Sequence, residues 1–314
     1  MWKTETVEWI DIELTSYCNI NCTGCLRQQS DNVSSILNKE YLKISDIKKW
    51  LNKKDFPSIK IINFCGSIDE PTSHPEFFEV LEYFKTWNCH INIATNGSIR
   101  TENWWKKLAL LLRDCSHNIH FGIDGLNGLS EKYRVNSNYD KVKKNFRSFI
   151  SNGGKAIWQF IVFDWNEHQI EDAYNFSVDE GFIGFRKIYS HRKTSGEKKI
   201  DRYESEEIEC KYAKQKRIFI NHLGNVIPCC HLNSETLEIL AAEKIKTNYG
   251  ELFLKHGKQL ETNLKYQKIN EVIEGQYFED IIKSWSTKNP IKKCHTTCKK
   301  KNYDLFDDTK IINN

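Results

Sequence analysis

Residues Thr15-Ser-Tyr-Cys-Asn-Ile-Asn-Cys-Thr-Gly-Cys25 place three cysteines within eight positions, at Cys18, Cys22 and Cys25. They follow an alternating apolar stretch at residues 10–14, and this alternation predicts a strand. A four-iron cubane cluster normally takes four thiolates. Three thiolates on one short loop would therefore leave one iron open to a small ligand. An open iron is a site for chemistry, because a reactant can bind directly to the metal.

The C-x3-C-x2-C spacing resembles the signature of the radical S-adenosylmethionine (radical SAM) superfamily. The resemblance implies that Cys18, Cys22 and Cys25 hold a 4Fe–4S cluster whose open iron binds S-adenosylmethionine. In that family one electron from the cluster cleaves the sulfonium, and the resulting 5′-deoxyadenosyl radical abstracts hydrogen from the substrate. One departure is Gly24, because the residue before the third cysteine is often aromatic in the family.

The composition is that of a globular protein, with 39% hydrophobic and 12% aromatic residues among 314. Positive and negative charges are interspersed and the net charge is +4, so we expect no nucleic acid partner. No apolar run is long enough to cross a membrane, and the first residues lack the pattern of a secretory signal. We therefore expect a cytoplasmic protein whose eleven cysteines are metal ligands or buried thiols rather than disulfides.

Strand and helix patterns alternate from about residue 7 to residue 188, which predicts an α/β fold with a parallel sheet. Predicted strands occupy residues 7–14, 60–64, 90–94, 119–123, 156–163 and 182–188, and predicted helices occupy residues 46–52, 76–86, 102–114, 140–151 and 167–180. The family resemblance implies a partial (β/α)6 TIM-like barrel, whose sites lie at the carboxyl ends of the strands. The predicted divisions are a radical SAM core barrel at 1–188, a linker or exposed loop at 189–205, a small auxiliary-cluster domain of a β-hairpin plus helices at 206–301, and a tail at 302–314.

The segment after the second predicted strand contains Asp69, Glu70 and Pro71 and resembles the Gly-Gly-Glu-Pro motif of the family. Here Asp69 stands where the second glycine is usual. The resemblance implies that these residues bind the methionyl amino group of the cofactor, and a carboxylate suits this role because it accepts hydrogen bonds from an ammonium group. An ordinary strand-to-helix turn, which also favours Gly, Asp and Pro, is the alternative.

Four further candidates for cofactor binding follow later strands. Thr95 and Asn96 resemble the Thr-Asn-Gly turn at the rim of the family's cofactor pocket, and a plain Asn-Gly turn is the alternative. Asp124 ends the fourth predicted strand and is a candidate for cofactor or substrate contact, unless it only forms a turn before a helix. Arg134 is a candidate partner of the cofactor carboxylate, with a surface arginine as the alternative.

A second cysteine set comprises Cys210, Cys229, Cys294 and Cys298, and a hairpin is predicted at residues 218–227. This set resembles the Twitch region, a shortened SPASM domain, and the resemblance implies an auxiliary 4Fe–4S cluster saturated by four thiolates. Cys230 could replace Cys229, or one position could be left open. Because four thiolates also suit zinc, a non-catalytic zinc-binding protein is the alternative to an enzyme.

The resemblance thus predicts a radical SAM enzyme that uses two 4Fe–4S clusters and S-adenosylmethionine. The expected substrate is a peptide or a small molecule such as a sugar, and the expected protein partner is an electron donor such as flavodoxin or ferredoxin. The auxiliary cluster would accept an electron or shape the pocket. The residues do not choose among dehydrogenation, epimerisation and crosslinking. A cysteine that donates hydrogen, Cys230 or Cys89, would suit an epimerase.

Overall fold

The computed structural model divides into two compact units, which are treated separately below. Unit 1 comprises Met1–Ser16, Ser30–Ser67 and Arg202–Asn302, and unit 2 comprises Tyr17–Gln29, Ile68–Asp201 and Tyr303–Asn314. The structure describes residues 2–65, 67–189, 203–242, 247–258, 260–301 and 309–312. The predicted linker at 189–205 and the predicted tail at 302–314 fall mostly outside these residues, and the predicted domain boundaries stay a prediction.

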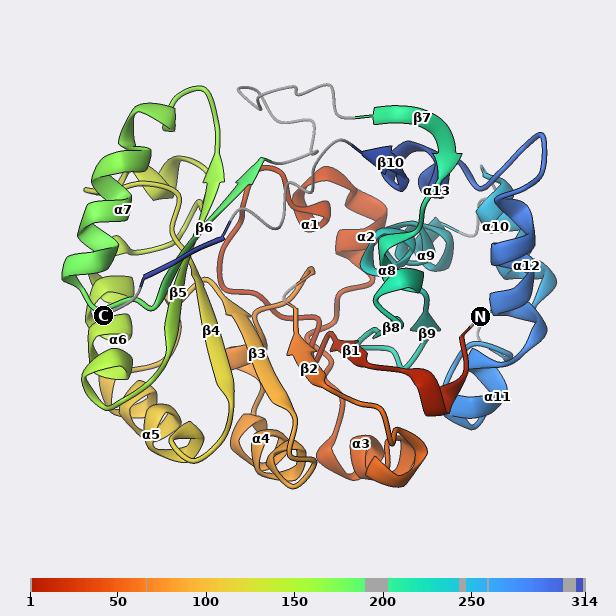
Figure 1. The fold of residues 1–314 in the computed structure, drawn as a ribbon, viewed down its shortest axis with the longest axis horizontal. Helices are drawn as coiled ribbons and strands as arrows, with labels where there is room; N and C mark the ends of the chain where they lie inside the picture. Colours follow the sequence, from red (N-terminus) through yellow and green to blue (C-terminus); the bar gives the residue numbers. More distant parts are fainter. Residues whose placement is uncertain are drawn as a thin grey trace. The chain divides into compact units, whose positions relative to one another are not determined.

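The sheet of unit 2 is mainly parallel (Figure 1). Its described strands are β3 (His90–Thr95), β4 (His117–Gly122), β5 (Ala156–Val162), β6 (Gly184–Tyr189) and β11 (Thr309–Ile311), in the order β11-β6-β5-β4-β3. Strands β3 to β6 pair in parallel, whereas β11 pairs antiparallel with β6. The carboxyl ends of β3 to β6 therefore lie at one edge of the sheet, where the predicted cofactor residues follow them.

Helices of unit 2 cover one face of this sheet (Figure 1). They include α4 (Phe77–Lys85), α5 (Glu102–Leu112), α6 (Tyr139–Ser151) and α7 (Ile170–Asp179), and α1 (Leu26–Gln29) follows the cysteine triplet. The core between sheet and helices is aromatic: Trp105 of α5 lies 5.0 Å from Phe121 of β4, and Phe146 of α6 lies 4.9 Å from Phe182 between ring centroids. Thr101 accepts a bond from the amide of Trp104 and caps the start of α5.

Unit 1 brings strands that lie far apart in the sequence into one sheet. Its strands β1 (Trp9–Ile12), β2 (Ile61–Phe64), β8 (Arg217–Ile220) and β9 (Val226–Ile227) lie in the order β2-β1-β8-β9. Strand β1 is parallel to both β2 and β8, and β8 and β9 form the predicted hairpin. Two further strands, β7 (Tyr203–Ile208) and β10 (Lys299–Lys301), pair antiparallel with each other.

Helices make up most of the remainder of unit 1. They are α2 (Asp31–Ser35), α3 (Ile44–Trp50), α8 (Lys211–Lys214), α9 (Cys230–Ala242), α10 (Asn248–Lys255), α11 (Ile269–Ile273), α12 (Gln276–Ser284) and α13 (Lys292–Thr297). Tyr277 and Phe278 of α12 are buried, and Phe278 packs edge-on against Trp2. Within the part of the chain that the structure describes, no helix has the length and apolar character needed to cross a membrane.

The structure confirms the predicted α/β fold. Each of the six strands predicted up to residue 188 is present, with ends that differ from the prediction by at most two residues. These strands were predictable because each carries a run of apolar residues bounded by polar turns. The parallel pairing of β8 with β1 adds a strand to the sheet that the sequence indicated only as half of a hairpin.

Candidate active site

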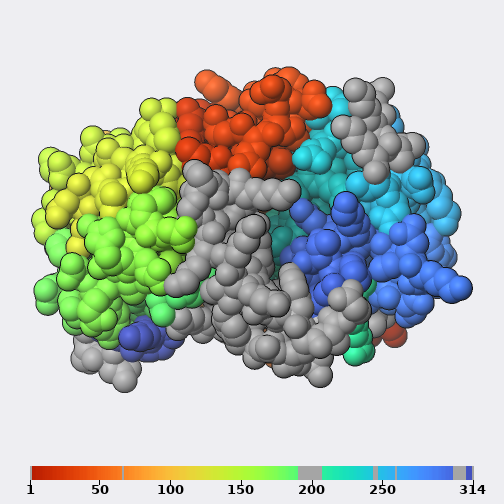
Figure 2. All heavy atoms as spheres, turned by 90° about the horizontal axis from the view of Figure 1, so that it is seen from above, coloured from red at the N-terminus to blue at the C-terminus, as the bar shows by residue number. Residues whose placement is uncertain are grey.

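Cys18, Cys22 and Cys25 lie on the loop at residues 17–25, which we call the N-terminal cysteine loop. All three are half-buried thiols in unit 2, and none of them forms a disulfide. The amide of Cys25 donates to the carbonyl of Cys22 at 3.0 Å, a turn that leads directly into α1. The segment that carries α1 forms part of the surface in the space-filling view, in the orange-red atoms of Figure 2. Asn21 and Thr23 of the loop are exposed, so part of the loop reaches the surface.

Backbone bonds fasten this loop to the segment after β4. The amide of Asn21 donates to the carbonyl of Val135 at 2.8 Å, and the amide of Thr23 donates to the carbonyl of Tyr133 at 3.2 Å. Two bonds on alternate residues hold the loop as a strand partner would. They flank Arg134, whose side chain is thereby placed beside the loop.

The carboxylate of Glu70 lies in a cage of hydrogen-bond donors. Its Oε1 accepts from Thr72 Oγ1 at 2.6 Å and from Thr95 Oγ1 at 2.7 Å, and its Oε2 accepts from the amide of Asn96 at 2.7 Å. The amide of Glu70 donates to the carbonyl of Tyr17 at 2.8 Å. Burial raises the pKa of Glu70, and the bonds from Thr72 and Asn96 oppose this rise. Two motifs predicted separately, after β2 and after β3, thus meet at one carboxylate.

Asn96 connects this carboxylate to the N-terminal cysteine loop. Its Nδ2 donates to Cys18 Sγ at 3.8 Å and to Asn19 Oδ1 at 2.9 Å. Asn19 in turn donates to Ser98 Oγ at 2.9 Å, and Ser98 Oγ donates back to Asn96 Oδ1 at 2.7 Å. Burial, followed by the charge of Glu70, raises the pKa of Cys18 to about 12. Sequence analysis missed Asn19 and Ser98, although both adjoin the motifs in sequence.

The neighbours of Glu70 are set by a short 3-10 turn, η3 (Pro71–Ser73). Pro71 occupies its first position, where a missing amide costs nothing, and Glu70 is its N-cap. Asp69 is 6% exposed and precedes this cap. Arg100, in the left-handed backbone region at φ 70°, donates to the carbonyls of residues 72, 73 and 74 and closes the turn. Arg100 is a third residue that sequence analysis missed.

Asp124 and Arg134 form a buried, two-pronged ion pair. Arg134 Nε lies 2.8 Å from Asp124 Oδ2, and Arg134 Nη2 donates to Oδ1 at 3.2 Å. The amide of Ile161 also donates to Asp124 Oδ1, and Asn166 Nδ2 donates to its backbone carbonyl, both at 2.8 Å. The structure thus brings together two residues that were predicted to contact the cofactor independently.

Glycine at position 122 makes room for this arginine. A Cβ built on Gly122 would lie 2.5 to 2.6 Å from three guanidinium atoms of Arg134. Burial lowers the pKa of Arg134, but the charges of Asp124 and then Cys22 outweigh it and raise the pKa above its ordinary value. The guanidinium therefore lies close enough to Cys22 to act on a thiolate there.

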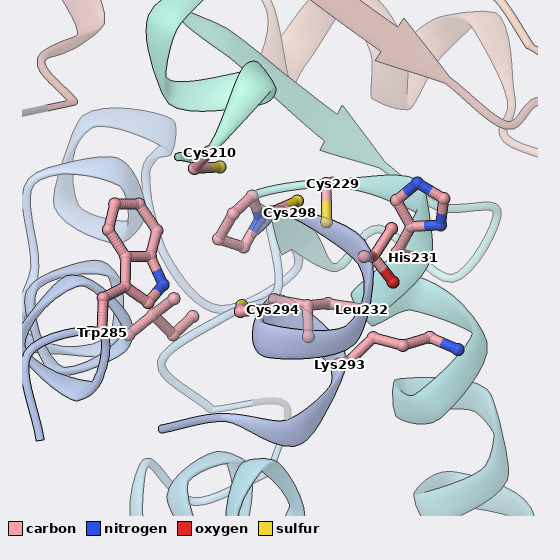
Figure 3. A pocket seen from close by; sticks show the side chains of 11 residues that line it. Cys210, Cys229, His231, Leu232, Trp285, Lys293, Cys294 and Cys298 are labelled. Atoms are coloured by element: carbon pink, nitrogen blue, oxygen red, sulfur yellow. The ribbon is translucent and has the colours of Figure 1, made fainter. Parts of the chain in front are cut away.

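The second cysteine set converges in unit 1 (Figure 3). Cys210 precedes α8, Cys229 precedes α9, Cys294 lies in α13 and Cys298 follows it. The four side chains are between 6% and 9% exposed and line one pocket, which we call the C-terminal cysteine pocket. Its walls also include Pro228, His231, Leu232, Ile281, Trp285, Lys293 and Thr297.

Burial and crowding govern the thiols of this pocket. Burial, followed by the charge of Cys210, raises the pKa of Cys294 to about 12. Burial also raises the pKa of Cys229, and the charges of neighbouring cysteines raise it further. Cys298 and Cys210 are within hydrogen-bonding reach, and this contact lowers the pKa of Cys210 and raises that of Cys298. Thiolates collected in this way repel one another unless a cation offsets their charge.

The thiol of Cys230 makes a different contact from that of its neighbour. Its Sγ lies 3.1 Å from the hydroxyl of Tyr212, and Cys230 is not among the residues that line the pocket. Cys89, the other thiol considered as a hydrogen donor, is buried and directly precedes β3. It therefore lies at the amino end of that strand, whereas Thr95 and Asn96 lie at the carboxyl end.

The cysteine sets can be compared with the geometry that a single metal ion requires. Among the described residues, no three His, Cys, Asp or Glu side chains converge closely enough to hold a single ion. A zinc ion needs its thiolates within about 2.3 Å of one centre. A cubane instead binds each thiolate to a different iron, so its ligands stand farther apart.

Comparison with known proteins identifies the same region of the chain. The sequence profile of the Radical SAM superfamily matches residues 12–177. A curated relative, the tungsten-containing aldehyde ferredoxin oxidoreductase cofactor-modifying protein of Pyrococcus furiosus, is 32% identical over 121 residues. That alignment covers 38% of this chain and 32% of the relative. The chain therefore matches about a third of the length of that relative.

Solved structures resemble the fold over most of the chain. Streptococcus suis SuiB bound to precursor peptide SuiA superposes with a TM-score of 0.62 at 14% identity, covering 90% of this chain and 68% of SuiB. The enzyme anSMEcpe, with AdoMet and a peptide bound, superposes with a TM-score of 0.60 at 14% identity, covering 90% of this chain and 84% of anSMEcpe. At such low identity these likenesses establish the fold.

Proposed function

Because the chain belongs to the radical SAM superfamily, a family of enzymes, we propose that it cleaves S-adenosylmethionine reductively and removes hydrogen from a peptide substrate. The proposed cluster ligands are Cys18, Cys22 and Cys25. A peptide is favoured over a sugar or another small molecule because both SuiB and anSMEcpe are solved with peptides bound. A small-molecule substrate is the second candidate.

The observation that carries this proposal is the chain of contacts from Cys18 through Asn96 to Glu70. It joins a loop with three thiols to a buried carboxylate. Three thiols suit a four-iron cluster with one open iron, and a carboxylate suits the ammonium group of an amino acid cosubstrate. When bound, that cluster and S-adenosylmethionine supply a single electron and a carbon radical able to abstract hydrogen. The protein's residues fix the positions at which this chemistry takes place.

Glu70 is the proposed partner of the cofactor's ammonium group. Its Oε1 accepts three bonds, from Thr72 twice and from Thr95, whereas its Oε2 accepts one from Asn96. The less occupied oxygen therefore retains capacity for an ammonium donor. The backbone around Asp69 and Pro71, held by η3, offers further contacts, and Thr95 and Asn96 fix the carboxylate.

Arg134 is the proposed partner of the cofactor's carboxylate. Asp124 holds the guanidinium through Nε and Nη2, and Nη1 takes no part in that pair. Backbone bonds from Asn21 and Thr23 to the residues on either side of Arg134 hold its segment beside the N-terminal cysteine loop. Asp124 thus acts as a positioning residue for Arg134 rather than as a direct contact.

The C-terminal cysteine pocket is the proposed site of an auxiliary 4Fe–4S cluster with Cys210, Cys229, Cys294 and Cys298 as ligands. Four buried thiols from three segments match the complete ligand set of such a cluster. Cys229 is preferred to Cys230 because its side chain lines the pocket, while that of Cys230 contacts Tyr212.

The deciding experiment is anaerobic reconstitution with iron and sulfide, followed by reduction with dithionite in the presence of S-adenosylmethionine. We expect about eight irons per chain and release of 5′-deoxyadenosine. A variant with Cys18, Cys22 and Cys25 replaced by Ala should lose the product, while Cys115→Ala, a free half-buried thiol remote from either set in sequence, should retain it. Product from the triple variant, or a colourless zinc-containing protein, would refute the proposal.

Substrate class is tested by isotope transfer. A deuterated candidate peptide, chosen from short reading frames beside the gene, should place deuterium in 5′-deoxyadenosine, and an unrelated peptide should not. Deuterium transfer from a small molecule alone would replace the peptide with the second candidate. The proposed physiological reductant is a flavodoxin or ferredoxin, which should substitute for dithionite in the same assay.

A further inference from the structure

Trp285 brings a polar group to the C-terminal cysteine pocket that the proposed ligands do not explain. It directly follows α12 and lines the pocket, and in Figure 3 its indole nitrogen is turned toward the side where Cys294 lies. The Nε1–H is buried and meets no well-aligned acceptor among the described residues. A buried donor without an acceptor destabilises the fold, so proteins rarely keep one without a reason.

The orientation of this indole is imposed by packing. Its ring lies edge-on to Trp2, with ring centroids 6.3 Å apart, and Trp2 lies edge-on to Phe278 at 5.4 Å. Trp2 provides a direct contrast, because its own Nε1 donates to the carbonyl of Arg217 at 2.9 Å. Of these two packed indoles, one has its N–H satisfied by the protein and the other directs its N–H into a pocket of thiols.

The surroundings of Trp285 indicate which acceptor would satisfy it. In Figure 3 the indole nitrogen lies on the side of the pocket where Cys294 lies, and a sulfur atom that carries negative charge accepts hydrogen bonds from such a donor. The other polar side chains that line this pocket are the remaining cysteines, Thr297, His231 and Lys293. Figure 3 shows His231 and Lys293 on the side of the pocket away from Trp285. The missing acceptor is therefore a sulfur atom that carries negative charge.

We propose that the Trp285 Nε1–H donates a hydrogen bond to a sulfur of the cluster held by Cys210, Cys229, Cys294 and Cys298, and that this bond raises the reduction potential of the cluster. The inference rests on the proposed auxiliary cluster. Reduction adds negative charge to the sulfurs, so a donor stabilises the reduced form more than the oxidised form. Trp285 is in this respect a positioning and tuning residue, not a catalytic one.

The test is a redox titration of the full chain in which Cys18, Cys22 and Cys25 are replaced by Ala, so that the auxiliary cluster alone gives a signal. Trp285→Phe removes the N–H, and incorporation of 3-benzothienylalanine at position 285 replaces the N–H by sulfur at nearly constant shape. The matched control is Trp104→Phe, on α5 of unit 2, where the indole packs on Phe77 and Phe78. The midpoint potential is followed by electron paramagnetic resonance, and iron content is measured on every sample.

Both Trp285 replacements should shift the midpoint to more negative potential with unchanged iron content, and Trp104→Phe should leave it at the parent value. Parent and Trp285 variants with equal iron and equal midpoints would overturn the inference while leaving the auxiliary cluster intact. A parent protein that holds no iron would instead overturn the auxiliary cluster, and the role of Trp285 with it. The benzothienyl variant keeps the test decisive if Trp285→Phe fails to fold.

Discussion

The N-terminal cysteine loop and the C-terminal cysteine pocket are assembled by the chain in opposite ways. The loop gathers three half-buried thiols within eight residues, whereas the pocket gathers four buried thiols from positions 210 to 298. The loop needs only a turn and two backbone bonds to its neighbour, while the pocket needs α8, α9, α12 and α13 to pack. An accessible three-thiol site suits an iron that exchanges ligands, and a buried four-thiol site suits a closed cluster.

The comparison is tested most severely by removing one thiol from each site. Cys22→Ala should lose about four irons and reduce 5′-deoxyadenosine release by at least roughly 100-fold, because the cosubstrate loses its metal. Cys294→Ala should also lose about four irons but keep cosubstrate cleavage within severalfold of the parent. Iron assay and chromatography of the nucleoside measure both. Equal loss of cleavage in the two variants would show that the sites are not separable.

The next largest effect concerns a buried pair in the sheet of unit 1. Glu13 follows β1 and is fully buried, and its Oε1 lies 2.7 Å from Nδ1 of His222 at the hairpin turn between β8 and β9. Asn233 Nδ2 donates to the other oxygen of Glu13 at 3.4 Å. His222→Ala should lower the free energy of unfolding by about 3 kcal/mol, because it leaves the carboxylate buried without its main partner.

Denaturant titration checks this value, with Lys283→Ala as the control. Lys283 is exposed and pairs with Glu279 one helical turn away, so its loss should cost about 0.5 kcal/mol or less. Iron content should fall first at the C-terminal cysteine pocket, since the hairpin carries Cys229. A His222→Ala protein as stable as Lys283→Ala would show that this pair does not secure unit 1.

A smaller effect is expected beside the N-terminal cysteine loop. Gly122→Ala would drive a methyl group into the guanidinium of Arg134 and should cost about 1–3 kcal/mol of stability. It should also weaken S-adenosylmethionine binding, measured by equilibrium dialysis, if Arg134 holds the cofactor's carboxylate. Gly184→Ala on β6 is the matched control, because its Cβ would meet no atom closer than 3.4 Å. Unchanged cofactor binding in Gly122→Ala would show that Arg134 does not bind the cofactor's carboxylate.

The smallest effect separates two adjacent cysteines. Cys230→Ala should lose the contact with the Tyr212 hydroxyl, about 1 kcal/mol of stability, and should keep the iron of both sites. Cys229→Ala should lose the iron of the C-terminal cysteine pocket. Iron content and thermal unfolding of the two variants provide the comparison. The reverse result would assign the cluster to Cys230.

Sequence patterns predicted the parts of the molecule that depend on local periodicity. The strands of the core follow from alternating apolar residues, and the family resemblance implied that the site lies at the carboxyl ends of these strands. The contact between Glu70 and Asn96 was not predicted, because the two motifs were interpreted separately. The pairing of Arg134 with Asp124 was not predicted, because a charged residue's partner depends on the path of the chain between them. Nor was the role of Asn19, whose partners lie 77 and 79 residues away.

The parallel pairing of β8 with β1 was also beyond sequence patterns. Arg217–Ile220 is a short, mostly apolar run that is typical of one strand of a hairpin. No local pattern indicates that the other edge of this strand pairs with β1. Trp285 was missed for a related reason. A tryptophan at the end of a helix is usually a packing residue, and only the fold reveals that its nitrogen lies against thiols.

The position of β8 beside β1 also governs when the protein can mature during synthesis. Strand β1 leaves the ribosome early and finds β2 soon afterwards, but its other edge waits for residues 217–220. At about 5–20 residues per second, that wait lasts on the order of tens of seconds. A nascent chain with an open strand edge is prone to aggregate. We therefore expect ribosome-bound chains that stop before β8 to require a chaperone, and iron–sulfur assembly to follow release rather than accompany translation.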